Sequence, residues 1–130
     1  MVGYMYSATG LTKDSGWQLG LRRTVPVARD VAWRALLAEV GVEASQPGEE
    51  FVTATGIRGQ VRSYRHEELI RMTWQPPGEP ESTLQLRVTP AATGTTVGFH
   101  QDRLNSAADR AKMLEYWAAA IDRLRATLEK

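Results

Sequence analysis

The C-terminal stretch Ser106–Lys130 carries the longest regular pattern of apolar positions in the chain. Large apolar residues recur there at spacings of three and four, namely Leu114, Trp117, Ile121, Leu124 and Leu128. This spacing places them on one face of an α-helix. Ser106 is a favourable N-cap, and Asp109 puts a negative charge in the first turn. The sequence therefore predicts a long terminal helix whose apolar face packs on the chain's own sheet or forms a short dimer seam.

Alternating apolar and polar residues before this helix predict β-strands. The predicted strands are Trp17–Thr24, Glu50–Thr55, Ile57–Arg65, Leu69–Gln75, Ser82–Thr89 and Thr95–Leu104. The last three of them place apolar side chains on one parity and polar side chains on the other. We therefore expect an antiparallel sheet with one apolar face and one face in water.

A second helical pattern lies between the first two predicted strands, over Val27–Glu39. Its apolar stripe consists of Val27, Val31, Leu36, Leu37 and Val40, with Trp33 near the edge of the stripe. Gly41 is a natural stop for this helix, and a polar loop follows it. The order of elements predicts an α+β fold, in which a curved antiparallel sheet grips a long C-terminal helix.

Length and composition favour one globular domain. The chain has 130 residues, of which 42% are hydrophobic, and this is enough for one core. We assign residues 17–130 to that domain and residues 1–16 to an N-terminal arm, which either caps the domain or exchanges between copies. Without a membrane span or a leader-like start, the default location is the cytoplasm.

Charge and residue types argue against several classes of function. Sixteen basic and fifteen acidic residues leave a formal charge of +1, so the chain has no overall electrostatic footprint for nucleic acid. The absence of cysteine excludes disulfides and thiolate chemistry. His66 and His100 do not form a metal-ligand pattern, and no G-x-S-x-G elbow is present. We therefore expect no metal and no cofactor, and we identify no catalytic residue.

The space between sheet and terminal helix is the candidate site, because a sheet bent around one helix leaves a concave, mostly apolar gap. Besides Leu19, Val61 and Val97, the inward-facing candidates for ligand contact are Trp17, Leu21, Phe51, Met72, Trp74, Leu86, Phe99, Gln101, Met113, Trp117 and Ile121. Trp74 and Trp117 either fill the core or line a ligand site. Gln101 turns an amide toward the apolar side, where it either hydrogen-bonds the protein or faces a ligand or water.

Several arginines share the polar parity of the sheet. They are Arg58, Arg62, Arg65, Arg71 and Arg87. Two interpretations remain open at this point. These side chains either gather as a basic patch on one surface of the sheet, or they form an ordinary solvated face interspersed with glutamates.

Four segments together resemble a known superfamily. They read R-x-V-P-V-A-R-D-V-A-W-R-A-L-L over Arg23–Leu37, G-x-V-R-S-Y-R-x-x-E-x-I-R-M-T-W over Gly59–Trp74, T-L-Q-L-R-V-T-P with G-T-T-V-G-F-H-Q over Thr83–Gln101, and Y-W-x-x-x-I-D-R-L over Tyr116–Leu124. In order and spacing they are similar to the SRPBCC, or START-like, superfamily, and to its branch named for the activator of Hsp90 ATPase homologue.

The resemblance implies a helix-grip (Bet v 1-like) fold with a cavity for apolar molecules between sheet and terminal helix. It also implies a departure, because relatives carry a second short helix and a Trp-containing loop where this chain has only Gly41–Glu49. We expect a binding protein for a small apolar or amphipathic molecule, lipid- or polyketide-like, present as a monomer or homodimer. The alternatives are a cyclase- or aromatase-like enzyme and a co-chaperone-like interaction module.

Overall fold

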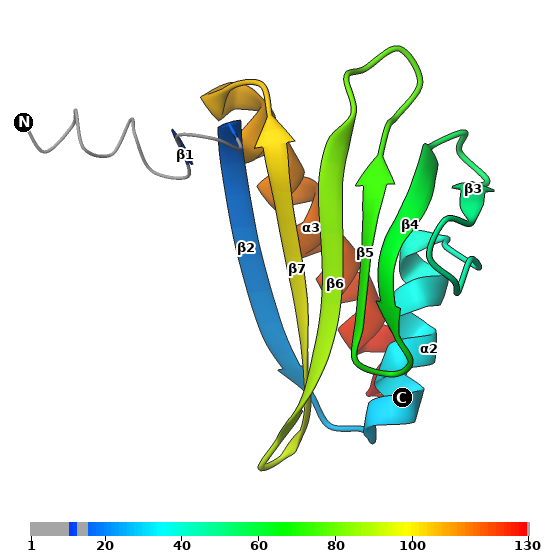
Figure 1. The fold of residues 1–130 in the computed structure, drawn as a ribbon. Coiled ribbons are helices and arrows are strands. Elements are labelled where there is room, and N and C mark those ends of the chain that lie inside the picture. The colour runs from blue at the N-terminus through cyan, green and yellow to red at the C-terminus, as the bar shows by residue number, and fades with distance from the viewer. Residues whose placement is uncertain (1–10, 13–15, 130) are drawn as a thin grey trace, which may run out of the picture.

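A curved antiparallel sheet with two helices on one of its faces makes up the protein in the computed structural model (Figure 1), which describes residues 11–12 and 16–129. In chain order the elements are β1 (Leu11–Thr12), β2 (Gly16–Val25), α2 (Arg29–Val40), β3 (Glu50–Val52), β4 (Arg58–Arg65), β5 (Leu69–Trp74), β6 (Ser82–Ala91), β7 (Gly94–Leu104) and α3 (Ala107–Leu128). Of the predicted N-terminal arm, residues 1–10 and 13–15 lie outside the described part of the chain.

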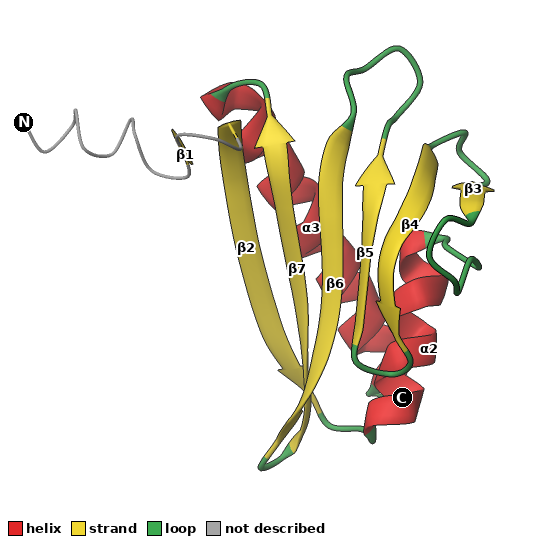
Figure 2. Cartoon of the chain, viewed as in Figure 1, coloured by secondary structure: helices red, strands yellow, loops and turns green. Residues whose placement is uncertain are grey.

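Within the described residues, seven strands form a sheet in the order β1-β2-β7-β6-β5-β4-β3. All neighbouring strands are antiparallel, as short connections and alternating patterns predict. Register shifts interrupt β2 near Trp17 and Leu19, and β4 near Val61 and Ser63. Such bulges bend a strand and increase its twist. Figure 2 shows the resulting curvature, with both helices behind the sheet.

The terminal helix packs on its own sheet, as one of the two sequence-based interpretations requires. Ser106 caps α3, because its side-chain oxygen accepts a hydrogen bond from the Asp109 backbone N–H at 3.1 Å. Trp117, Ile121 and Leu124 are buried in the core. Their neighbours on the same helix face, Leu114 and Leu128, are partly buried against that core. The apolar face of α3 is therefore occupied within one chain.

The shorter helix differs from its prediction in which face it buries. Its buried residues are Ala32, Trp33, Leu36 and Val40, so placing Trp33 at the edge of the apolar stripe was wrong. Trp33 points into the core and meets the Tyr64 ring edge-on at a centroid distance of 6.0 Å. Val31 is only half-buried. The observed orientation of the helix buries Trp33, its largest side chain. This removes more apolar surface from water than burial of Val31 would. Gly41 ends the helix at φ 87°, as predicted.

Two strand ends differ from the prediction by two residues or more. β3 ends at Val52 rather than at Thr55, because the chain turns there and the Gly56 N–H donates to the Thr53 carbonyl at 2.9 Å. β6 continues through Pro90, which pairs with Thr95 close to the β6–β7 turn. Proline ends a strand only where its missing N–H is needed for the ladder, and strand ends tolerate it.

Candidate functional site

The structure places most of the predicted site residues in one continuous core. Met72, Trp74, Leu86, Phe99, Gln101, Trp117 and Ile121 are all buried. The half-buried candidates pack against the same core; they are Trp17, Leu21, Phe51 and Met113. Phe99 stacks on Trp117 at a centroid distance of 4.8 Å, and Trp74 lies 5.6 Å from Trp117. The aromatic side chains of the predicted site therefore contact one another in the interior.

A chain of hydrogen bonds crosses this aromatic core and joins the helix to three strands. The indole N–H of Trp117 on α3 donates to Gln101 Oε1 on β7 at 2.7 Å. Gln101 Nε2 donates to the Ser82 hydroxyl on β6 at 2.9 Å, and that hydroxyl donates to the Trp74 carbonyl on β5 at 3.2 Å. Gln101 is only 1% exposed and Ser82 only 5%. The buried amide is therefore satisfied by protein partners at both ends.

The chemistry of the partners fixes the direction of every bond in this chain. An indole N–H can only donate, so the amide oxygen of Gln101 has to face Trp117. A backbone carbonyl can only accept, so the Ser82 hydroxyl has to donate to Trp74. An amide can make about four hydrogen bonds, and two of those of Gln101 are used here. Gln101 therefore retains one N–H and one acceptor lone pair for a further partner.

A narrow cleft at one end of the molecule reaches this polar chain. The cleft has a volume of about 30 Å³. Gln101 and Ser82 line it together with Met113 of α3, Pro76 and Glu79 of the β5–β6 loop, and other residues near the start of α3. Figure 2 shows this loop and the start of α3 at the same end of the sheet. Of the predicted contact residues, Gln101 and Met113 line the cleft.

Polar contacts join the walls of the cleft to the rest of the fold. Lys112 Nζ on α3 lies 3.5 Å from a carboxylate oxygen of Glu79, and both side chains are about half exposed. Arg110 donates to the Gln18 carbonyl on β2 at 2.7 Å. Exposed ion pairs are worth little, roughly 0–1 kcal/mol. The Glu79–Lys112 ion pair therefore contributes little to holding the cleft closed.

Sequence reasoning missed Ser82, Glu79 and Lys112 as parts of this site. A signal was available for Ser82, because it shares the inward parity of Leu84 and Leu86 at the start of a strand. No comparable signal marks Glu79 and Lys112, which come together only through the path of a loop. The sequence did identify Gln101 as the buried polar group.

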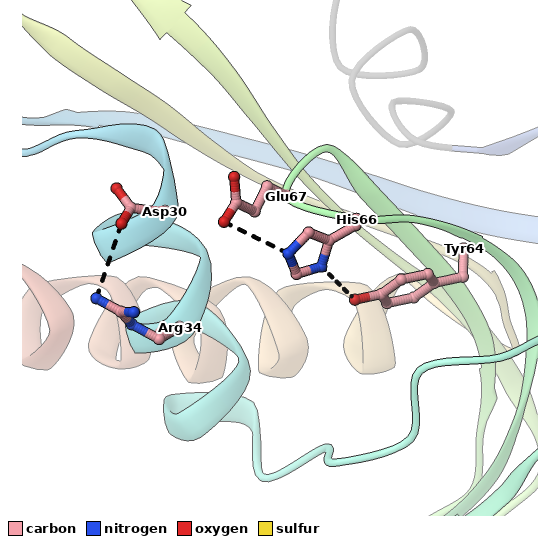
Figure 3. A network of polar contacts seen from close by, with 5 residues as sticks. All are labelled: Asp30, Arg34, Tyr64, His66 and Glu67. Atoms are coloured by element: carbon pink, nitrogen blue, oxygen red, sulfur yellow. Dashed lines mark hydrogen bonds and ion pairs between the residues drawn. The ribbon is translucent and has the colours of Figure 1, made fainter.

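A second polar cluster lies at the β4–β5 turn, beside α2 (Figure 3). The Tyr64 hydroxyl and His66 Nδ1 are 3.0 Å apart, and His66 Nε2 is 3.4 Å from a Glu67 carboxylate oxygen. Glu67 has a φ of 58°, which suits a tight turn. The His66 side chain is 72% exposed. Because the His66 ring is exposed to water, we interpret these contacts as part of the structure of the turn. The presence of Tyr, His and Glu side chains in this order does not by itself make a catalytic site.

The described residues contain no group of three or more His, Asp or Glu side chains arranged to hold a metal ion. No helix in this part of the chain is long and apolar enough to cross a bilayer.

Solved structures with the same fold come from several bacteria. CalU16 from Micromonospora echinospora has a TM-score of 0.72 at 18% identity, with 85% of this chain and 74% of that chain covered. Protein CV1439 from Chromobacterium violaceum has a TM-score of 0.70 at 18% identity, with 87% and 98% covered. DynU16, a protein in the dynemicin biosynthetic locus, has a TM-score of 0.78 at 19% identity, with 87% and 47% covered.

Sequence comparisons assign the family. No curated protein matches the sequence. A family model described as "Activator of Hsp90 ATPase homolog 1-like protein" matches residues 27–129, from just before α2 to just after α3. This range contains the buried hydrogen-bond chain and the cleft. The chain therefore belongs to the family of activator of Hsp90 ATPase homolog 1-like proteins, within the SRPBCC superfamily.

Proposed function

We propose that the protein binds a small apolar or amphipathic molecule between its sheet and α3, with a polar group of that molecule hydrogen-bonded to Gln101. The observation that carries the proposal is the buried amide of Gln101 at the base of a cleft, with hydrogen-bonding capacity left over. Pockets for small molecules combine apolar walls with a few such fixed polar groups. The aromatic rings of Trp74, Phe99 and Trp117 supply the apolar surface.

The size of the cleft requires the molecule to open before it binds a ligand. A volume of about 30 Å³ holds one or two water molecules, whereas ligand pockets typically measure roughly 300–1,000 Å³. The first turns of α3 and the β5–β6 loop are the walls that separate most easily, because the exposed Glu79–Lys112 pair joins them. The ligand-free form is therefore the closed form, and binding selects an open one.

We place the ligand in the lipid- or polyketide-like class. Such molecules combine a long apolar body with a carbonyl or hydroxyl group. This combination matches an aromatic interior that contains a buried amide with hydrogen-bonding capacity to spare. Among the structural neighbours, DynU16 is a protein in the dynemicin biosynthetic locus, which supports an occupant of biosynthetic origin.

Native mass spectrometry of freshly purified protein tests the proposal. We expect an additional mass of a co-purified small molecule, and a thermal shift with members of a panel of fatty acids and polyketide-like aromatics. Gln101→Leu should weaken the binding found in that panel. Gln85→Leu is the matched control, because it makes the same change on the opposite face of the neighbouring strand. A bare-chain mass together with no thermal shift across the panel would contradict the proposal, and chemical conversion of the added compound would favour the enzyme alternative.

A further inference from the structure

The outer face of the sheet, opposite the helices, carries a trough over two glycines. Gly20 on β2 pairs with His100 on β7, and Gly98 on β7 lies between Arg22 on β2 and Arg87 on β6. The trough has a volume of about 460 Å³. It is lined by Gly20, Leu21, Arg22, Gln85, Arg87, Gly98, Phe99 and His100. Figure 1 views the sheet from this outer face, with β2, β7 and β6 side by side.

The backbone conformation does not require glycine at position 20 or at position 98. Gly20 and Gly98 do not have the positive φ found at Gly41 or Gly56. A Cβ added at Gly20 would meet nothing within 4 Å, and one added at Gly98 would lie at 3.4 Å from the Arg22 side chain. Glycine inside a strand weakens it, and it often marks a place where a ligand approaches the backbone closely. The two glycines leave the floor of the trough open.

The walls of the trough are cationic and lack a counter-charge. Arg22 and Arg87 are exposed, and within the described part of the chain neither guanidinium makes an ion pair or a hydrogen bond. His100 adds a ring nitrogen, which lies 3.1 Å from Gln18 Oε1. The lining residues include no carboxylate. Because Gly98 separates the two arginines by two strand spacings, their Cα atoms are about 10 Å apart, so both guanidiniums can converge on one anion.

We propose that this trough binds a small phosphate ester, with its phosphate between Arg22 and Arg87 and its organic body over Gly20 toward His100 and Gln85. Guanidinium groups bind phosphate oxygens through paired, charge-assisted hydrogen bonds. The volume of the trough exceeds that of a phosphate group, which leaves room for an organic body beside the phosphate. This site lies on the face of the sheet opposite the proposed apolar site and is independent of it.

Titration of ¹⁵N-labelled protein with AMP, inorganic pyrophosphate and adenosine tests this site. We expect AMP to shift the amide signals of Gly20 and Gly98 saturably at millimolar concentrations, and adenosine to leave them unchanged. Removing both charges with R22Q/R87Q should weaken AMP binding by about tenfold or more. The matched control R58Q/R62Q removes two charges from β4 on the same sheet and should bind AMP as the original protein does.

A glycine variant separates binding from folding. Gly20→Thr places a side chain on the floor of the trough without a backbone conflict, so it should raise the melting temperature and weaken the AMP-induced shift of the Gly98 amide signal. Three results would overturn the proposal: no saturable shift with either AMP or pyrophosphate, equal loss of binding in R58Q/R62Q, or unchanged binding in a folded Gly20→Thr variant.

Discussion

Gln101 joins α3 to β6 in the buried hydrogen-bond chain. Replacing it with leucine leaves the Trp117 indole N–H buried without an acceptor, and an unsatisfied buried donor costs about 1–3 kcal/mol. We expect Gln101→Leu to lower the free energy of unfolding by that amount in urea titrations. Trp117→Phe removes the donor and keeps a ring against Phe99. The double variant should therefore lose less stability than the sum of the single variants, and strict additivity would contradict the hydrogen-bond chain.

Gly59 makes a second residue-scale prediction, because its neighbours leave no room for a side chain. A Cβ there would overlap the Thr73 carbonyl oxygen and the Phe51 ring. We expect Gly59→Ala to cost about 1–3 kcal/mol through forced shifts of backbone and ring. Gly20→Ala is the matched control in the same sheet, and it should gain about 0.5 kcal/mol because an open position loses only glycine's flexibility. Equal effects of the two substitutions in urea titrations would contradict this account.

Single residues also show how far the sequence determines the site. Strand parity alone predicted that the Gln101 amide points inward, because parity is a local property of a strand. The sequence did not predict which residues would form hydrogen bonds with this amide. Trp117 and Ser82 meet Gln101 only through the pairing of β6 with β7 and the position of α3 on the sheet. These are properties of the assembled fold, and a local pattern does not contain them.

Among the elements, α3 offers the sharpest test of a sequence signal. Ser106 was identified as an N-cap, and its side chain accepts from the Asp109 N–H. We expect Ser106→Ala to destabilise the protein by about 1 kcal/mol, measured by urea unfolding followed by circular dichroism. Ser106→Asp keeps a side-chain acceptor and adds a charge that favours a helix N-terminus, so it should retain most of the stability. A loss in Ser106→Asp as large as in Ser106→Ala would contradict the capping role.

The elements that were predicted well share long, regular patterns. The terminal helix has 22 residues and repeats its apolar spacing from Leu114 to Leu128. The sequences of β5 to β7 alternate clearly, so periodicity was sufficient to predict these elements. The shorter helix has 12 residues and several adjacent apolar side chains, so more than one face was plausible and Trp33 was misplaced. The end of β3 depended on a turn from Thr53 to Gly56, where a local turn hydrogen bond outweighs strand propensity.

On the scale of the whole molecule, the two faces of the sheet carry different kinds of side chain. Its inner face holds the aromatic core, the buried amide and the cleft. Its outer face holds the glycine trough with Arg22 and Arg87. Of the five arginines in the predicted basic patch, Arg87 alone lines this trough. The described residues with large exposed apolar side chains are Val52 and Tyr116, on β3 and α3 respectively. Among the described residues, exposed apolar side chains therefore do not gather into a broad apolar surface.

The same architecture predicts a monomer. The apolar face of α3, which is the only coiled-coil seam suggested by the sequence, is buried against the chain's own sheet. Both edges of the described sheet are short strands, β1 with two residues and β3 with three, and short edges discourage pairing with another chain. We expect sedimentation equilibrium to give the mass of one chain, and a melting temperature that does not change with protein concentration. A stable dimer, or a melting temperature that rises with protein concentration, would contradict this prediction.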